Sequence, residues 1–401
     1  MSLHTTELTL MHALRAEAGE LSQRMVANRR RIHMFPELGL RLPATEAVIV
    51  EELKRIGVDS IKTGEALSSV VAEIRGIGGT AGRPQTVALR ADMDALPLGE
   101  HNDLDFASKN TGCMHACGHD AHISMLLGAA EILVARRAGF GGTVRLLFQP
   151  GEEGYGGARI MIEEEALAGV DAAFALHVDP SSPAGTLCVR KGTIMASADS
   201  FMVTFKGAGG HASMPHHTRD PIPAIGPFVD GLSHAAARET DPDDRVVLSV
   251  TQVRAGTTNN VIPPIAECGG TIRALSGRGR AAAHEQLRRI ARGVAAARGI
   301  HVDVSVHDGY PPTVNHDAPV ELMERTAERV GLRVLRMPSP VMGAEDFSYM
   351  LERVPGAFAF LGARTEGGGP LHSDLMKLDE SVFASGAALH AAVAMSYLAG
   401  N

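Results

Sequence analysis

The sequence contains no tryptophan, and aromatic residues of all kinds make up 4% of its 401 residues. Cysteines are also few, namely Cys113, Cys117, Cys188 and Cys268. They are too sparse for a disulfide framework, which excludes the small disulfide-stapled folds and favours a reducing compartment. We therefore expect a cytoplasmic protein.

Positive charge is not in excess, since 38 Lys and Arg stand against 46 Asp and Glu, for a formal net charge of -8. The arginines are scattered, so the basic footprint of a nucleic-acid-binding protein is missing. Residues 1–14 have neither a basic segment nor an uninterrupted apolar run, and no signal peptide is expected there. No stretch is judged long and apolar enough to span a bilayer, so we expect neither nucleic acid nor a membrane as partner.

Two widespread catalytic motifs are missing as well. The chain has no glycine-rich phosphate loop and no Gly-x-Ser-x-Gly turn, which excludes nucleotide chemistry and serine hydrolysis. What remains is the composition of a folded protein, with 45% hydrophobic and 21% charged residues. A chain of this length is expected to form about two domains.

The first half of the chain alternates helical and strand-like segments. Helices are predicted at 8–34, 45–56, 123–135 and 158–167, and strands at 70–74, 87–90, 144–148 and 172–178. This alternation predicts an α/β fold, a mixed and largely parallel sheet covered by helices. The family resemblance described below implies that the sheet is of the phosphorylase/hydrolase-like type.

The pattern changes from about residue 191. Strands are predicted at 200–205, 246–253 and 266–274, and helices near 221–237 and 280–297, before a helix at 319–330, a strand at 357–361 and a closing helix at 381–398. We interpret residues 191–308 as an inserted α+β module, which the family resemblance described below implies to be a lid and dimerisation domain. The catalytic domain is then discontinuous and comprises residues 1–190 and 309–401.

The segment 114–122 carries the densest chemistry in the chain. It combines the thiol of Cys117, the imidazoles of His115, His119 and His122, and the carboxylate of Asp120. Thiolate and imidazole together suit Zn, Mn, Co or Ni in a catalytic site. The segment is therefore predicted to form half of a metal centre.

Acidic and imidazole side chains also follow three predicted strands. Asp92 and Asp94 follow one strand, Glu152 and Glu153 follow another, and His177 ends a third. In open α/β sheets the ligand site lies beyond the carboxyl ends of the strands. Adjacent glutamates are ordinarily a solvated loop end, but beside a metal cluster one can bind metal while the other handles protons, since neighbouring side chains of extended chain point in opposite directions.

Several further segments give the chain a family resemblance. They are residues 31–39, 89–97, 114–122, 148–153, 176–178, 209–215, 260–263, 343–347 and 371–373. In this order they resemble the aminoacylase/carboxypeptidase-type dinuclear metallohydrolases. They are more closely similar to the amidohydrolase subgroup, which includes hippurate hydrolases, N-acyl-amino acid amidohydrolases and plant auxin-conjugate hydrolases.

The resemblance implies a set of metal ligands and two carboxylates that act with them. The implied ligands are Cys117, His119, Glu153, His177 and His372. Cys117 would bridge two ions where other branches of the family use an aspartate. Asp94 would orient a ligand imidazole, with a turn-forming aspartate as the alternative. Glu152 would be the general base.

Three residues of the insertion are implied to contact the substrate. His211 would donate a hydrogen bond to the oxyanion in the site of a partner subunit, which requires an oligomer; the alternative is a surface histidine at a strand end. Asn260 and Arg273 would bind substrate, since a guanidinium holds a carboxylate bidentately. A structural role is the alternative for both.

Four other residues rank lower. Cys113 is interpreted as a bystander, and His115 and His122 as groups that pack or support the ligands. Asp346 is interpreted either as the cap of a helix at 347–351 or as part of a motif that lines the site.

These predictions converge on a two-metal amidohydrolase that cleaves N-acyl or N-aroyl amino acids, hippurate-like amides among them, with Glu152 as general base and acid. Two divalent ions per subunit are expected, Mn or Zn first and Co or Ni next, in a homodimer or higher homo-oligomer. A metallo-carboxypeptidase or dipeptidase with the same centre remains an alternative, as does a metal-sensing or scaffold protein. The acyl group and the amino acid are left open, because pocket shape decides both.

Overall fold

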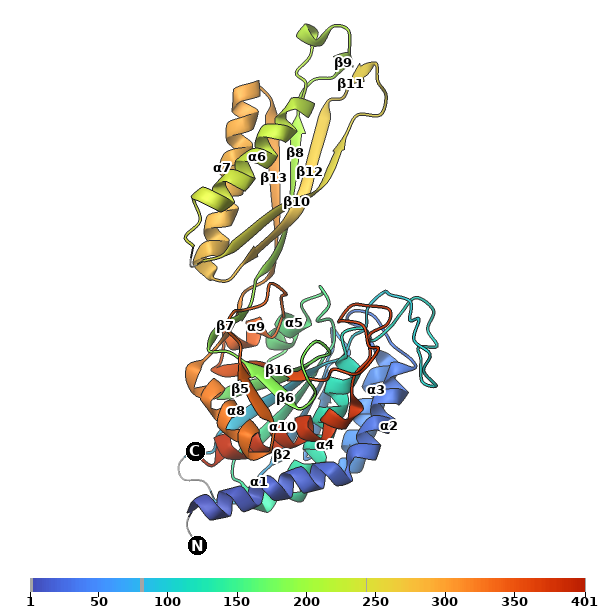
Figure 1. Cartoon of the computed structure of the whole chain (residues 1–401), viewed down its shortest axis with the longest axis vertical. Coiled ribbons are helices and arrows are strands. Elements are labelled where there is room, and N and C mark those ends of the chain that lie inside the picture. The colour runs from blue at the N-terminus through green and yellow to red at the C-terminus, as the bar shows by residue number, and fades with distance from the viewer. Residues whose placement is uncertain (1–2, 80–82, 243, 401) are drawn as a thin grey trace. The chain divides into compact units, whose positions relative to one another are not determined.

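The computed structural model describes residues 3–79, 83–242 and 244–400. The chain divides into two compact units (Figure 1). The larger unit comprises Met1–Ile194, Val314–Ser339 and Asp346–Asn401, and the smaller unit comprises Met195–Thr313 and Pro340–Glu345. The predicted insertion, 191–308, therefore differs from the smaller unit at both ends.

One segment of the smaller unit was placed in the other domain by the sequence prediction. Pro340–Glu345 belongs to the smaller unit, where Val341 forms an isolated parallel bridge with Met195 and accepts the backbone N–H of Ala196. A segment of six residues is too short to show a period of its own, so nothing in its pattern indicated this pairing.

The larger unit is built on an eight-stranded mixed sheet. Its strand order is β1 (Ser60–Thr63), β2 (Val70–Arg75), β4 (Thr143–Gln149), β3 (Thr86–Asp92), β5 (Ala172–Asp179), β16 (Gly356–Gly362), β6 (Thr186–Val189) and β15 (Arg333–Arg336). The neighbouring strands β4, β3, β5 and β16 run parallel, whereas β1, β2 and β6 introduce antiparallel pairs. The predicted α/β fold class is confirmed.

Helices cover this sheet in layers. The helices of the larger unit are α1 (Leu3–Glu20), α2 (Ser22–His33), α3 (Pro43–Ile56), α4 (His119–Ala135), α5 (Gly157–Glu163), α8 (Asp317–Arg329), α9 (Ser348–Leu351) and α10 (Phe383–Leu398). α4 packs against α10 and the strands, and α1 and α2 lie over both of these helices. Nearly every residue of α4 and α10 is buried, so together with the central strands they form the core.

Two expectations about the helices need correction. The single helix predicted at 8–34 is broken at Leu21, where the hydroxyl of Ser22 donates to the carbonyl oxygen of Gly19 and so competes with the helical ladder. One helix of the described chain, Glu380–Leu398, is long and apolar enough to cross a membrane by length and composition. Of its most apolar window 78% is buried, so its apolar character serves the core here.

The smaller unit is a four-stranded antiparallel sheet with two helices on one face. Its strand order is β10 (Val246–Ala255), β12 (Ile265–Ala274), β8 (Ala198–Lys206) and β13 (His301–Tyr310), and its helices are α6 (Ile225–Arg238) and α7 (Gly277–Arg298). Phe201, Phe205, Phe228 and Leu287 fill the core between the sheet and the helices. Two short strand pairs complete the chain, β9 (Gly210–His211) with β11 (Val261–Ile262), and β7 (Gly192–Met195) with β14 (Thr313–Asn315).

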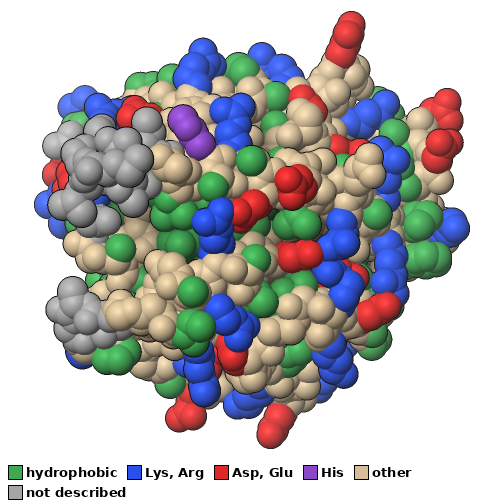
Figure 2. Space-filling model, turned by 90° about the horizontal axis from the view of Figure 1, so that it is seen from below, with side chains coloured by type: hydrophobic (Ala, Val, Ile, Leu, Met, Phe, Trp, Pro, Cys, Tyr) green, Lys and Arg blue, Asp and Glu red, His purple; other side chains and the backbone are tan. Residues whose placement is uncertain are grey.

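The surface shows no single-sign region on the face at the bottom of Figure 1. Lys and Arg side chains are interspersed there with Asp and Glu side chains (Figure 2). A mixed surface of this kind does not attract a polyanion along a continuous track.

Candidate metal centre

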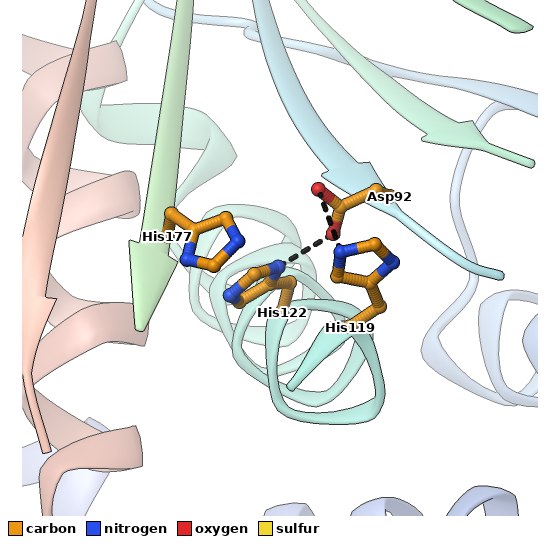
Figure 3. A group of neighbouring side chains, drawn as sticks. All are labelled: Asp92, His119, His122 and His177. Carbon is orange, nitrogen blue, oxygen red and sulfur yellow. Dashed lines mark hydrogen bonds and ion pairs between the residues drawn. The ribbon is translucent and has the colours of Figure 1, made fainter. Parts of the chain in front are cut away.

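The parallel strands deliver their polar residues to one edge of the sheet. Asp92 is the last residue of β3, His177 lies near the end of β5, and β3 and β5 are neighbours. His119 begins α4, which also carries His122 one turn further on (Figure 3). One atom from each of these four side chains lies within 4.8 Å of the others.

Gly118 sets the positions of Cys117 and His119 on either side of it. Its φ is +84°, in the left-handed region, and a Cβ there would lie 2.4 Å from Cγ2 of Val178. A side chain at this position is therefore excluded both by backbone strain and by space. Cys117 consequently faces the strand end, with its Sγ 3.4 Å from Nε2 of His177.

His119 carries the clearest sign that a cation belongs here. Its ring is fully buried, and neither nitrogen has a hydrogen-bond partner among the described residues. Nδ1 lies 3.5 Å from Asp94 and Nε2 lies 3.6 Å from Asp92. Burial alone would lower the pKa of His119, but Asp92, Asp94 and Glu153 together raise it to about 10. An orphaned imidazole among carboxylates is what a metal site requires of its ligands.

His177 has the protonation state of a metal ligand. Its Nδ1 donates to the carbonyl oxygen of Val178 at 2.8 Å, which leaves the Nε2 lone pair directed toward Cys117. Burial lowers the pKa of His177 well below its usual value, so the ring is neutral. The thiol of Cys117 has its pKa raised, by burial first and then by Glu153, and a cation would reverse that shift.

His122 lies beside the ligand residues, and both of its ring nitrogens are used in hydrogen bonds. The backbone N–H of Val178 donates to its Nε2 at 2.8 Å, so the ring proton must be on Nδ1, which donates to Asp92. Both nitrogens are thus engaged inside the protein. His122 orients Asp92 and is not available as a ligand.

The two glutamates lie on a loop that Asp94 fixes. The carboxylate of Asp94 accepts the backbone N–H groups of Glu152 and Glu153 at 2.9 and 3.0 Å. Glu153 lies 3.3 Å from Nε2 of His372. Burial would raise the pKa of Glu153, but the contacts with His372 and His119 lower it. The predicted role for Asp94, orienting an imidazole, is therefore joined by a second one, which is to hold the acidic loop.

His372 adopts a strained backbone conformation to reach the site. Its φ is +63°, which is uncommon for a residue with a side chain, and its N–H donates to the carbonyl oxygen of Ala116. Such a conformation costs on the order of 1 kcal/mol and is typical of functional sites. Contacts between side-chain atoms, none longer than 4.8 Å, thus connect all five implied ligands, Cys117, His119, Glu153, His177 and His372.

A buried group of charged and polar side chains around Arg90 holds Asp92, and no role for Arg90 was predicted from the sequence. Arg90 donates to Asp92 at 2.7 Å, to Asp346 at 3.0 Å and to Gln149 at 2.9 Å. Burial would raise the pKa of Asp92, but Arg90 and two histidines hold it well below its usual range. The Arg90-x-Asp92-x-Asp94 spacing, which puts alternate residues on one face of a strand, is the signal that could have revealed this buried group.

Asp346 belongs to the same buried group, and its predicted role as a helix cap is wrong. No side chain caps α9; the carboxylate of Asp346 instead accepts from Arg90, from the Gln149 amide and from the backbone N–H of Ala158 at the start of α5. Asp346 thus contacts residues on both sides of the loop that carries Glu152 and Glu153, in keeping with the alternative that it belongs to a motif lining the site.

Two neighbouring residues stay outside the ligand group. The thiol of Cys113 donates to the carbonyl oxygen of Pro36, and burial raises its pKa to about 11. His115 is buried, and burial lowers its pKa to about 3, so its ring is neutral. Neither ring nitrogen of His115 has a hydrogen-bond partner among the described residues.

The three implied substrate contacts lie in the smaller unit, and two of them are neighbours. His211 is exposed on β9 and accepts hydrogen bonds from Ser213 at its Nδ1, while the N–H of Ala212 donates to the carbonyl oxygen of Asn260. Arg273 lies near the opposite end of β12 from Ile265, roughly 25 Å along a strand at about 3.3 Å per residue. Within the smaller unit the structure therefore unites His211 with Asn260 but not with Arg273.

Thiol, imidazole and carboxylate groups gathered beyond the strand ends of an α/β sheet are the arrangement of a metal-dependent hydrolase. The pattern of peptidase family M20/M25/M40 matches residues 88–396. The chain belongs to this family of metal-dependent peptidases and amidohydrolases, which confirms the resemblance seen in the sequence.

Three curated relatives match nearly the whole chain. Thermostable carboxypeptidase 1 of Saccharolobus solfataricus is 40% identical, covering 97% of this chain and 99% of its own length. IAA-amino acid hydrolase ILR1-like 2 of Arabidopsis thaliana is 40% identical, covering 96% and 87%. N-acetylcysteine deacetylase of Bacillus subtilis is 38% identical, covering 89% and 92%.

Two solved structures have the same fold. A protein from methicillin resistant Staphylococcus aureus, described as an aminohydrolase, superposes with a TM-score of 0.90 at 31% identity, covering 96% of this chain and 99% of that one. A Bacillus subtilis protein described as a dinuclear metal binding peptidase of the M20 family gives a TM-score of 0.84 at 34% identity, covering 95% and 99%.

Proposed function

We propose that the protein is a two-metal amidohydrolase that cleaves N-acyl or N-aroyl amino acids into a carboxylic acid and a free amino acid. The observation that carries this proposal is the buried His119 ring, whose unpartnered nitrogens lie among Asp92, Asp94 and the Cys117 and Glu153 groups. Relatives named for hydrolysis of IAA-amino acids and for deacetylation of N-acetylcysteine support the substrate class.

Cys117, His119, Glu153, His177 and His372 would hold the metals, with Cys117 as the shared ligand. Their donor set accepts Mn or Zn, and also Co or Ni. When bound, two such ions polarise the scissile carbonyl group and lower the pKa of a water.

The side chains perform the remaining steps. Glu152, held by Asp94 through the loop backbone, takes the proton of the attacking water and returns it to the leaving nitrogen. His122 and Arg90 keep Asp92 ionised and fixed beside His119. His211 would hydrogen-bond the substrate oxygen as negative charge develops there, with Asn260 beside it to bind substrate. In this proposal the enzyme is a cytoplasmic homodimer or higher homo-oligomer.

A second candidate function uses the same centre on peptides. It is favoured by the 40% identity to thermostable carboxypeptidase 1 over nearly the whole chain. Glu152 would play the same part in both reactions. The two functions differ in the group on the carbonyl side of the scissile amide, which is a simple acyl group in one case and an amino-acid residue in the other.

The test is amine release from N-benzoylglycine, a set of N-acetyl amino acids and matched dipeptides. Chelated protein is reconstituted with Mn or Zn, and Glu152→Gln serves as the control. Activity is expected to return with metal and to fall by roughly 10²–10⁴-fold in Glu152→Gln, which should keep its metal content. Metal-loaded protein that hydrolyses only the dipeptides would favour the peptidase, and silence on every substrate would refute both functions.

A further inference from the structure

The short strand pair of the smaller unit holds the backbone of His211 and Asn260 in fixed positions. β9 and β11 pair antiparallel, with His211 opposite Val261, at one end of the smaller unit (Figure 1). The N–H of Ala212 donates to the carbonyl oxygen of Asn260 at 3.0 Å, and the N–H of Met214 donates to that of His211 at 2.9 Å. One hydrogen-bonded segment therefore carries both residues.

Ser213 determines which nitrogen of the His211 ring carries the proton. Its hydroxyl lies 2.8 Å from Nδ1 of His211, and its backbone N–H donates to the same nitrogen at 3.1 Å. A backbone N–H can only donate, so Nδ1 is an acceptor without a proton, and the ring proton is on Nε2. No other described residue makes a hydrogen bond with this ring. His211 therefore presents Nε2–H as a donor.

Thr258 acts in the same way on the side chain of Asn260. The Thr258 hydroxyl donates to Oδ1 of Asn260 at 3.1 Å and so occupies the acceptor atom of the amide. The amide nitrogen, which carries two N–H donors, makes no hydrogen bond with any other described residue. Because the side chains of His211 and Asn260 are both exposed, their donors are accessible.

A pair of donors whose acceptor atoms are already occupied selects an anionic oxygen. An oxyanion or a carboxylate offers lone pairs only, so it can bind such donors without meeting a competing lone pair. Donors that are oriented in advance need no reorganisation when negative charge develops. The two hydroxyls therefore prepare this segment for an anion before any substrate arrives.

We propose that Ser213 and Thr258 are positioning residues, which commit His211 and Asn260 to donate hydrogen bonds to anionic oxygens of the substrate. This role rests on the proposed function, in which His211 contacts the oxygen that becomes negatively charged, and it adds two hydroxyls that act only through their neighbours. Ser213 then affects the transition state through His211, and Thr258 affects substrate binding through Asn260. The two hydroxyls should change different kinetic constants.

The first test measures kcat and KM of the metal-loaded enzyme with N-benzoylglycine. Ser213→Ala should lower kcat by about two- to tenfold with KM unchanged, because one hydrogen bond to His211 is lost. Ser213→Thr keeps the hydroxyl and should restore kcat. In a His211→Ala background Ser213→Ala should cause no further loss, whereas a purely structural effect of Ser213 would persist there.

Thr258 is tested with the same substrate. Thr258→Val should raise KM by about two- to tenfold with kcat unchanged, and Thr258→Ser should restore KM. Ser233→Ala is the matched control, because the exposed Ser233 hydroxyl of α6 donates to the carbonyl oxygen of Val229 within its own helix. The control should change neither constant.

The second test reads the tautomer of His211 in metal-free protein labelled with ¹⁵N-histidine, at mildly alkaline pH. Protonated and unprotonated ring nitrogens give separate resonances, and the His211 signals are identified by their absence in His211→Gln. The wild type should have a protonated Nε2 and an unprotonated Nδ1. The Nδ1 resonance should move in Ser213→Ala, which lacks one of the two donors to this nitrogen.

This spectrum separates the proposal from the proposed function, because it requires no turnover. The expected tautomer together with silence on every substrate would refute the amidohydrolase and support the positioning of His211 by Ser213. A protonated Nδ1 in the wild type, or a kcat that Ser213→Ala leaves unchanged, would overturn the role of Ser213 and leave the amidohydrolase standing. An unchanged KM in Thr258→Val would overturn the role of Thr258 in the same way.

Discussion

Replacing Gly118 by alanine tests the local geometry of the centre. The alanine would have to keep the backbone φ of +84°. Its Cβ would lie 2.4 Å from Cγ2 of Val178 and 3.2 Å from Cδ1 of Leu378, and both of these residues are buried. The left-handed backbone costs roughly 1–2 kcal/mol for a residue with a Cβ. Overpacking of a filled core adds about 1–3 kcal/mol. Gly118→Ala should therefore lower the free energy of unfolding by roughly 2–5 kcal/mol.

Gly112→Ala is the matched control. Gly112 has a φ of +76°, and a Cβ on it would meet no atom of the described chain within 4 Å. It therefore carries the backbone cost of about 1–2 kcal/mol without the contact. Urea unfolding of chelated protein measures the difference between the two variants, expected at about 1–3 kcal/mol.

The same pair of variants reports on metal binding. Gly118 separates Cys117 from His119, so relief of the contact with Val178 must displace one of these two side chains. Gly118→Ala should bind Zn or Mn more weakly by at least about tenfold, as expected when ligand orientation is disturbed, and Gly112→Ala should bind as the wild type does. Equal stability and equal metal affinity in the two variants would falsify this reasoning.

Three further predictions concern protonation, support and metal. Burial would raise the pKa of Asp199, but hydrogen bonds from Arg280, from the N–H of Gly309 and from His284 lower it. The ionised Asp199 therefore stabilises the folded protein fully above the unfolded carboxyl pKa of about 4, and this stabilisation is lost as pH falls through the pKa of the folded state. Urea unfolding from pH 7 to pH 3 should show Asp199→Asn destabilised by about 2 kcal/mol at pH 7 and converging with the wild type in acid. His122→Phe should lose about 2–4 kcal/mol of stability, because the buried N–H of Val178 and one carboxylate oxygen of Asp92 lose their hydrogen-bond partner, yet retain the full metal content by elemental analysis. Chelation should lower the melting temperature, since metal at 100 times its Kd contributes about 2.7 kcal/mol; an unchanged melting curve would contradict a structural contribution from the metals.

Much of the fold follows from local patterns. The central strands are continuous apolar runs bounded by polar residues, so the sheet and its fold class were predictable from the sequence. The edge strands β1 and β15 have four residues each and show no such pattern, which explains why they were missed. β13 was missed although His301–Tyr310 alternates polar and apolar residues in its first half, a signal that was present and overlooked.

The site was predictable where its residues lie in dense motifs and not where they depend on partners far away in the sequence. The state of His122 is set by the N–H of Val178, and the ionised state of Asp92 is set largely by Arg90. Neither follows from sequence spacing, because the strands must first be placed side by side. Arg273 shows the same limit, since its distance from His211 depends on the direction in which β12 runs.

Strand β3 and the acidic loop differ in how they tolerate change. Arg90 and Asp92 share one face of a central strand, with Asp94 two residues beyond, so inserting or deleting one residue within the strand would turn the side chains that follow it toward the opposite face. Tyr155 lies between two glycines and its side chain is exposed, so a substitution there leaves the register of the sheet intact. Position 155 can therefore be substituted without shifting the residues that strand β3 positions.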